Sequence, residues 1–151
     1  MVPMPSAVST VDVARLATRL RSGVWRLARR MRTESHVDLS PTLHAALGTL
    51  SRHEPMTAGD LARHEQVRKS TATRTIAALE DQGLVDRTAD PLDGRVAWLR
   101  LTSEGRRIVH TARRRHDAFL AARIKRLPPE DLATLERAAA LLESFVEEGE
   151  H

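Results

Sequence analysis

Residues 68–75 combine cations and short hydroxyls in the order Arg-Lys-Ser-Thr-Ala-Thr-Arg-Thr, which suits contact with a polyanion. Phosphates are bound by cations and hydroxyl donors, whereas base edges are recognised by forked donors such as the guanidinium of arginine. Ser70, Thr73 and Arg74 are three and four residues apart, so a helix presents them on one face. The segment therefore predicts a helix that contacts nucleic acid. The alternative is an ordinary solvated surface helix.

The second chemically suggestive segment is the turn Asp90-Pro91-Leu92-Asp93-Gly94-Arg95. An Asp-Pro pair starts a turn and a glycine permits unusual backbone angles, which places Arg95 at the tip. An exposed arginine is attracted into a narrow minor groove by the concentrated phosphate potential there. Asp93 can hold that guanidinium through a charge-assisted hydrogen bond and set its direction. The alternative is that the Asp93–Arg95 pair only stabilises the turn.

The elements between these segments predict a helix-turn-helix followed by a hairpin. Thr57 is a helix N-cap, with Asp60 three residues later in place of the usual glutamate of a capping box. A second helix over about 69–82 buries Ala72, Ile76 and Leu79 and ends before Gly83, where a C-cap favours positive φ. Residues 84–85 and 96–101 are predicted strands, the latter with period-two alternation.

Longer helices flank this unit on both sides. Apolar residues recur every three or four positions over about 10–32, with arginines off the stripe, and polar residues 33–38 interrupt the pattern. Ser40 and Pro41 start a helix that runs to about His53. Thr102 caps a helix over about 103–126, and Pro129 starts a final helix of near-heptad apolar spacing. The predicted fold class is mainly α with a small β-hairpin wing, that is, a winged helix-turn-helix flanked by long terminal helices.

Composition and charge agree with a DNA-binding protein of ordinary core size. The chain has 151 residues, 41% of them hydrophobic, and a net charge of +4. Residues 127–151 hold seven acids against Arg137, so residues 1–126 carry 23 bases against 13 acids. A basic body with an acidic tail suits a polyanionic partner, although solvated helix faces explain part of the asymmetry.

Several classes of protein and site are disfavoured by composition. The chain has no cysteine, which excludes disulfides, thiolate metal ligands and a thiol redox switch. No apolar run approaches the roughly 20 residues that span a bilayer. Residues 1–10 lack the basic start and apolar stretch of a secretory signal. We therefore expect a cytoplasmic protein without a membrane partner.

Five segments of the chain resemble the MarR family of bacterial transcription regulators. They are Thr57-Ala-Gly-Asp-Leu-Ala-Arg63, Ser70-Thr-Ala-Thr-Arg74, Leu79-Glu-Asp-Gln-Gly-Leu-Val-Asp-Arg87, the turn Asp90–Arg95, and Leu99-Arg-Leu-Thr-Ser-Glu-Gly105. Arg95 matches the family's wing arginine and Asp93 its partner, whereas Arg68 stands where the family often has a Ser or Thr cap. The DNA-binding residues expected from the pattern and the resemblance together are Arg68, Lys69, Ser70, Thr71, Thr73, Arg74, Arg87, Asp93 and Arg95.

The resemblance implies a repressor that binds double-stranded DNA as a homodimer and is released by a small ligand. Residues 37–102 would form the winged helix-turn-helix lobe, and residues 1–36 and 103–151 the helical dimerisation region. The apolar stripes over 13–31, 108–120 and 132–146 are too extensive for one small lobe to cover. Intertwined helices of two chains would bury them, with half-sites about one turn (~10 bp) apart. From the stripes alone, an intramolecular helix bundle is an equal alternative.

The expectation of a small effector comes from the family resemblance. Members of this family that sense organic anions, often aromatic, hold them between the dimer helices and the DNA-binding lobe. The resemblance thus suggests a small aromatic or anionic effector, with Trp25 and His44 as ligand-binding candidates. Both have a plainer interpretation, Trp25 as core or interface and His44 as a satisfied polar group. No cofactor or metal site is expected. A metal-responsive or ligand-independent winged-helix protein is the alternative. His110 and His116 are six residues apart and lie on different faces of a helix, so they do not form a metal-binding pair. A site that joins His44 and His110 through folding is open, but nothing in the sequence supports it.

An enzyme is not expected, and we assign no catalytic residues. His53-Glu54, His64-Glu65 and His116-Asp117 are sequence neighbours, which point about 100° apart on a helix and do not form a catalytic pair. No nucleophile elbow, phosphate loop or His-Glu-x-x-His motif is present. A nonspecific architectural DNA protein is also disfavoured, because the chain pairs a recognition helix with a wing.

Overall fold

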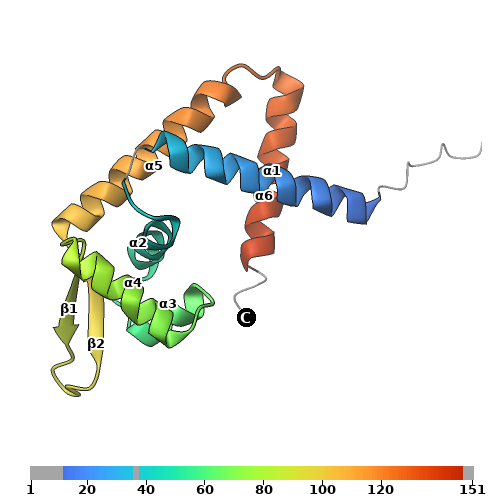
Figure 1. Cartoon of the computed structure of the whole chain (residues 1–151). Helices are drawn as coiled ribbons and strands as arrows, with labels where there is room; N and C mark the ends of the chain where they lie inside the picture. Colours follow the sequence, from blue (N-terminus) through green and yellow to red (C-terminus); the bar gives the residue numbers. More distant parts are fainter. Residues whose placement is uncertain (1–11, 36–37, 148–151) are drawn as a thin grey trace, which may run out of the picture.

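The computed structural model describes residues 12–35 and 38–147, which form six helices and one antiparallel hairpin. The order is α1 (Val13–Glu34), α2 (Pro41–His53), α3 (Ala58–His64), α4 (Lys69–Asp81), β1 (Val85–Ala89), β2 (Ala97–Leu101), α5 (Ser103–Ile124) and α6 (Pro129–Glu147). Figure 1 shows α2, α3, α4 and the hairpin gathered into one lobe, from which α5 leads away to α6. The mainly helical fold with a β-hairpin wing confirms the predicted fold class.

The helix starts follow the capping residues that the sequence predicts. The hydroxyl of Ser40 accepts the N–H of Leu43, and the hydroxyl of Thr102 accepts the N–H of Gly105. Thr57 and Asp60 form a complete capping box, so aspartate serves in place of glutamate. The described part of α1 is capped by Asp12; the start predicted near residue 10, and part of the 33–38 interruption, lie outside the described residues.

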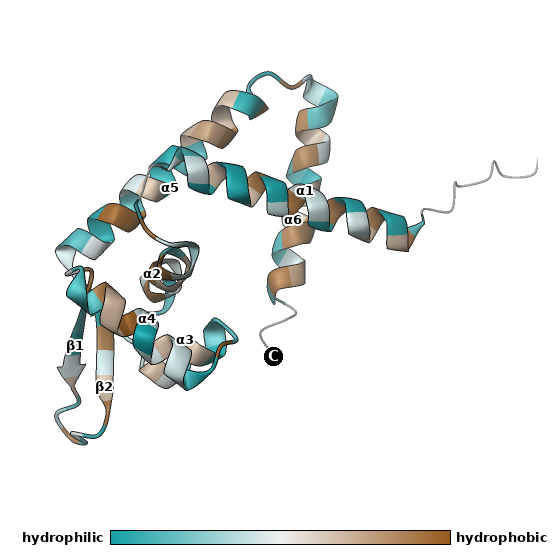
Figure 2. Ribbon diagram, in the orientation of Figure 1, coloured by the Kyte–Doolittle hydropathy of each residue, from teal (hydrophilic) through white to brown (hydrophobic). Residues whose placement is uncertain are grey.

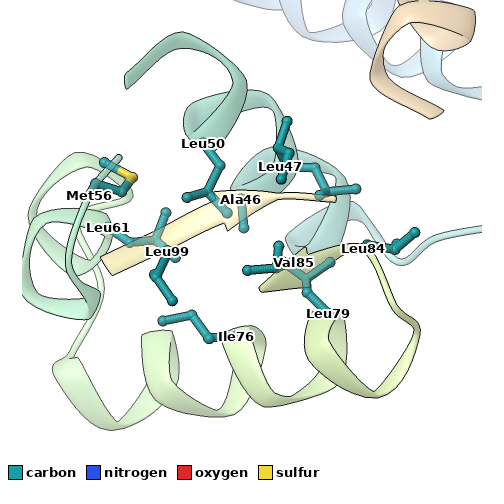
Figure 3. Close-up of a cluster of buried hydrophobic side chains, with 11 residues drawn as sticks. Ala46, Leu47, Leu50, Met56, Leu61, Ile76, Leu79, Leu84, Val85 and Leu99 are labelled. Atoms are coloured by element: carbon teal, nitrogen blue, oxygen red, sulfur yellow. The ribbon is translucent and has the colours of Figure 1, made fainter. Parts of the chain in front are cut away.

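The core of the lobe is an apolar cluster between α2, α3, α4 and the hairpin (Figure 3). Ala72, Ile76 and Leu79 are buried on one face of α4, as their helical spacing predicts. From α2 the buried apolar residues are Ala46, Leu47 and Leu50, whereas Leu43 is only partly buried. This packing fixes which face of α4 is left for solvent.

The hairpin and α5 are joined tightly to the end of α4. Val85 pairs with Leu101 and Ala89 with Ala97, so the strands run from the core to a projecting tip. Gly83 has φ +68°, the conformation expected of a residue just past a helix end. At Gly105 a side chain would collide with the carbonyl oxygen of Leu84, so the first turn of α5 lies directly against the α4–β1 connection.

The terminal helices contrast with the lobe because none of their described residues belongs to its core. No residue of α1 or α6 is buried, although α1 packs against α5. Apolar segments on both helices are visible in Figure 2. Their strongly exposed members are Val13, Leu16, Leu20, Val24, Trp25 and Leu27 of α1, and Leu132, Leu135, Leu141, Leu142, Phe145 and Val146 of α6. The predicted stripes are therefore not closed into an intramolecular bundle within the described chain.

Candidate nucleic-acid interface

The exposed face of α4 carries most of the predicted recognition residues. Ser70, Thr73 and Arg74 are exposed, opposite the buried stripe of the same helix. The hydroxyl of Thr73 donates to the carbonyl oxygen of Lys69 at 2.9 Å, so its oxygen is the atom left to accept a further bond. Thr71 is only half-buried and lines a small cavity that Thr75 shares, which places it beside this face rather than at its centre.

The start of α4 presents backbone N–H groups and positive charge. Arg68 is the N-cap residue and makes no side-chain capping bond, and Lys69 is the first helical residue. The first turn contains no acidic residue. A helix start of this kind favours a phosphate, because its N–H groups and dipole attract negative charge. The helix start at Lys69 agrees with the sequence prediction despite the arginine at the cap.

The tip of the wing is held by hydrogen bonds to Asp90. One carboxylate oxygen of Asp90 accepts the N–H groups of Leu92 at 2.8 Å and Asp93 at 3.0 Å. The other accepts the indole N–H of Trp98 at 2.8 Å. These donors, that of Trp98 above all, hold the pKa of Asp90 below its ordinary value. Trp98 lies eight residues away on the returning strand, and no local sequence pattern indicates this contact.

Asp93 binds the backbone of Arg95 and not its guanidinium, which is the group that we expected from the sequence. Its carboxylate accepts the backbone N–H of Arg95 at 3.0 Å. The ion pairs of the described residues do not include one between Asp93 and the Arg95 guanidinium. Asp93 therefore shapes the turn and leaves the guanidinium to extend from the tip. This geometry agrees with the simpler alternative, in which the pair stabilises the turn.

Arg87 is already engaged within the lobe. Its Nε and one terminal nitrogen donate to the two carboxylate oxygens of Glu80 at 3.1 and 2.9 Å, which links β1 to α4. The two side chains are about one-third exposed. A DNA contact by Arg87 would compete with this bidentate pair. We therefore expect Arg87 mainly to hold strand β1 against α4. Glu80 was missed because only folding brings residues seven apart, on a helix and a strand, into contact.

The two effector candidates occupy different surroundings. His44 lines a cavity of about 310 Å³ between α1, α2 and α5. Trp25 is 69% exposed on α1 and does not line this cavity. The other lining residues are Met31, Leu47, Gly48, Arg52, Ile108, Val109, Ala112, Arg113, His116, Asp117 and Leu120. The structure thus separates the two candidates.

The polar groups of this cavity centre on two imidazoles. The rings of His44 and His116 lie 6.0 Å apart, and Nε2 of His116 is buried without a hydrogen-bond partner. Burial, followed by the nearby His116 and then Arg32, lowers the pKa of His44. A neutral imidazole beside an unsatisfied nitrogen is suited to accept a polar ligand. His116, rather than the proposed His110, accompanies His44.

In two of the three neighbouring histidine and acid pairs, His53-Glu54 and His64-Glu65, the side chains have other partners. His53 stacks on His64, with ring centroids 4.3 Å apart. Glu54 instead binds the backbone N–H of Leu101 and the guanidinium of Arg106, and Glu65 accepts the hydroxyl of Thr49. No group of three potential metal ligands occurs among residues 12–35 and 38–147. None of the helices described there is long and apolar enough to cross a membrane.

Known proteins share both the sequence and the fold. Residues 39–97 match the model of the MarR family. An HTH-type transcriptional regulator of Mycobacterium tuberculosis is 40% identical over 138 residues, covering 89% of this chain and 95% of that protein.

Two solved structures extend the comparison. A MarR family protein from Bacillus stearothermophilus has a TM-score of 0.80 and 26% identity over 93% of this chain and 99% of that chain. Streptococcus pneumoniae FabT in complex with DNA has a TM-score of 0.73 and 23% identity over 91% and 99% of the two chains.

Proposed function

Because this chain belongs to the MarR family of transcription regulators, we propose that it is a repressor that binds a pseudo-palindromic operator as a homodimer and is released by a small molecule. The observation that carries the proposal is the pairing of two surfaces on one lobe. These are the exposed face of α4 and the projecting tip of the wing, and the Glu80–Arg87 pair joins α4 to strand β1 of the wing. Two such elements suit adjacent grooves of a duplex.

The proposed contacts divide between phosphates and bases. Arg68, Lys69 and Ser70, at the start of α4, would bind phosphates, and Arg74 would read a base edge in the major groove. Arg95 would enter the minor groove from the tip of the wing. Thr71 and Thr73 stay as peripheral contacts, since one is half-buried and the other already donates within the helix. The DNA-bound state of the FabT structure supports a duplex as the partner of this fold.

The homodimer would be made by residues 1–36 and 103–151. Two observations support it, the first being the apolar side chains that α1 and α6 leave exposed. The second is charge, since α1 contains seven arginines and one glutamate whereas α6 contains five acids and one arginine. Because α6 packs so little within its own chain, α1 and α6 of two chains can cover each other. Burial of the apolar side chains would then provide the affinity, and the opposite charges would set the orientation of the two helices.

The cavity between α1, α2 and α5 is the proposed effector site. It joins an apolar floor to the imidazoles of His44 and His116, with Arg52 and Arg113 also in its lining. This combination suits a small organic acid whose apolar or aromatic body enters the floor. Trp25 would belong to the dimer surface instead, because it lies on α1 away from this cavity. A regulator of chromosomal operators would act in the cytoplasm.

The decisive experiment is selection of bound duplexes from a random DNA pool by the purified full-length protein. We expect a palindromic consensus with half-sites about one turn (~10 bp) apart, bound by two chains. Enrichment of no sequence, with affinity that only falls steeply with salt, would indicate a nonspecific DNA protein instead.

The selected duplex then tests regulation. Transcription from a promoter that overlaps it should fall when the protein is added. Titration with small aromatic carboxylates should release the DNA. Release by zinc ions instead, reversed by a chelator, would favour a metal-responsive regulator.

A further inference from the structure

Leu92, at the tip of the wing, is a large apolar side chain that the rest of the lobe does not cover. It is 98% exposed, the highest value among the exposed large apolar residues of the described chain. The others lie on α1, at the end of α5, at Leu127 in the α5–α6 connection or on α6, apart from Val67 at 38%. The proposed dimer accounts for the helical ones. It does not account for Leu92, because the wing projects away from both α1 and α6 (Figure 1).

The loop that carries Leu92 is well ordered by its own hydrogen bonds. The backbone N–H of Leu92 donates to Asp90 at 2.8 Å, and the same carboxylate is fixed by Trp98. The loop is closed where the N–H of Asp90 donates to the carbonyl oxygen of Val96 at 2.9 Å. A partner that contacts Leu92 therefore meets a preformed surface and loses little affinity to ordering the loop.

Leu92 shares this loop with Arg95, the residue proposed to enter the minor groove. That groove is about 6 Å wide and its walls are deoxyribose rings, which offer C–H surface to an apolar side chain. Leucine is among the apolar residues that proteins place in the minor groove. A loop with an arginine and an exposed leucine thus suits both the negative electrostatic potential of the groove and its apolar walls.

We propose that Leu92 packs against the deoxyribose wall of the minor groove beside Arg95 and holds the wing in place. The inference rests on the proposed function, in which the wing enters DNA. The contact carries no base-specific hydrogen bond, so it strengthens binding at any sequence that admits the wing. It also neutralises no phosphate, which distinguishes it from the cationic contacts of α4.

The test compares Leu92→Ser and Leu92→Met with the wild-type protein on the duplex that the wild type selects. Loss of the apolar contact should weaken binding by roughly tenfold in Leu92→Ser. Leu92→Met keeps the apolar surface and should bind within about twofold of wild type. The dependence of affinity on salt should be the same for all three proteins.

Hydroxyl-radical footprinting locates the contact on the DNA. Leu92→Ser should lose protection of the deoxyriboses under the wing and keep the protection under α4. The side chain is fully exposed, so the thermal midpoint of unfolding should not change, which separates a lost contact from a lost fold.

Two results would overturn the inference. One is a Leu92→Ser protein with wild-type affinity and footprint. The other is a Leu92→Ser protein that binds DNA normally but represses poorly, which would make Leu92 a contact for another protein. If the wild-type protein itself enriches no duplex, the proposed function fails, and that outcome is distinct because it does not depend on the variant.

Discussion

Three arginines of the lobe show how surroundings assign different tasks to one side-chain type. Arg87 is held by both oxygens of Glu80. Arg95 has its backbone N–H bound by Asp93, while its guanidinium has no hydrogen-bond partner among the described residues. Arg74 lies exposed in the middle of the recognition face. An arginine without a local partner keeps its bonding capacity for a ligand, so Arg74 and Arg95 are the residues whose loss should affect DNA most directly.

Replacement of Arg95 with alanine should weaken operator binding without unfolding the protein. The loss should be roughly 1.5–3 kcal/mol per wing, the usual range for hydrogen bonds to charged groups. Arg107→Ala is the matched control, because it removes one positive charge at the start of α5, where Arg107 pairs with Glu104. A gel-shift titration measures both proteins. Equal affinities for Arg95→Ala and wild type would contradict the minor-groove assignment.

Replacement of Arg74 with alanine should reduce sequence discrimination. A base-reading arginine contributes roughly 1–3 kcal/mol to the difference between the correct and a wrong base pair. The measurement is competition between the selected duplex and duplexes mutated at each position. Similar losses on specific and random DNA would instead identify Arg74 as a phosphate contact.

His44 should make the stability of the protein depend on pH near neutrality. Its pKa is lower in the folded state than the ordinary 6.5, so below that pH the unfolded chain binds the proton more readily. Stability is therefore fully present above 6.5 and declines as pH falls through this value toward the folded pKa. The charged and titratable groups around His44 are Arg32 of α1, Arg52 of α2, and Arg113, His116 and Asp117 of α5.

The measurement for His44 is the free energy of unfolding at about pH 8 and about pH 5. The decline should be smaller in His44→Gln than in wild type. An NMR titration of the His44 ring with a midpoint at or above its ordinary value would refute the expected direction.

At the scale of elements, the lobe is organised by links between neighbouring helices and strands. Glu80 joins α4 to β1, and Asp90 joins the turn to Trp98 on β2. Glu54, at the end of α2, binds both β2 and α5. The angle between recognition helix and wing therefore depends on side chains that need not touch DNA.

The effect of Glu80→Gln on operator binding should differ in sign between two possible roles of Arg87. If Arg87 positions the wing, Glu80→Gln should weaken operator binding, because the wing loses its link to α4. If Arg87 is mainly a phosphate contact, Glu80→Gln should strengthen binding by releasing it. We expect the weaker binding, with a stability change no greater than about 1 kcal/mol for so exposed a pair.

A binding isotherm for Glu80→Gln, Arg87→Gln and the double variant measures this. If positioning is the role, the double variant should bind about as well as Arg87→Gln alone. Independent, additive losses would contradict it.

Local spacing made much of the fold predictable. The starts of α2, α3 and α5 followed from caps within three residues, and the buried face of α4 followed from its helical period. The Glu80–Arg87 and Asp90–Trp98 contacts could not be predicted, because they join separate elements. The same holds for His44 and His116, which meet only when α2 packs near α5. Asp93 was expected at the Arg95 guanidinium, since sequence spacing does not tell a backbone donor from a side-chain donor.

At the scale of the whole molecule, α1 and α6 have more apolar surface than one chain covers. Leu135→Asp should dissociate the proposed dimer, because a carboxylate in an apolar interface costs roughly 3 kcal/mol or more. Thr134→Asp is the control, since it places the same charge about 100° around the helix. Sedimentation equilibrium measures both. A monomeric wild type, or a Leu135→Asp protein that stays dimeric, would argue against α6 as the interface.

The close approach of Gly105 to Leu84 has a mechanical consequence. With no room for a side chain at this junction, the lobe and the start of α5 must move as one body. The 22 residues of α5 form a lever of about 33 Å, because each residue adds about 1.5 Å. A tilt of about 5° at its far end would therefore carry the lobe through about 3 Å. In a dimer, such a movement would change the distance between the two recognition helices. They would then no longer match two successive turns of the major groove, although each lobe kept its own structure.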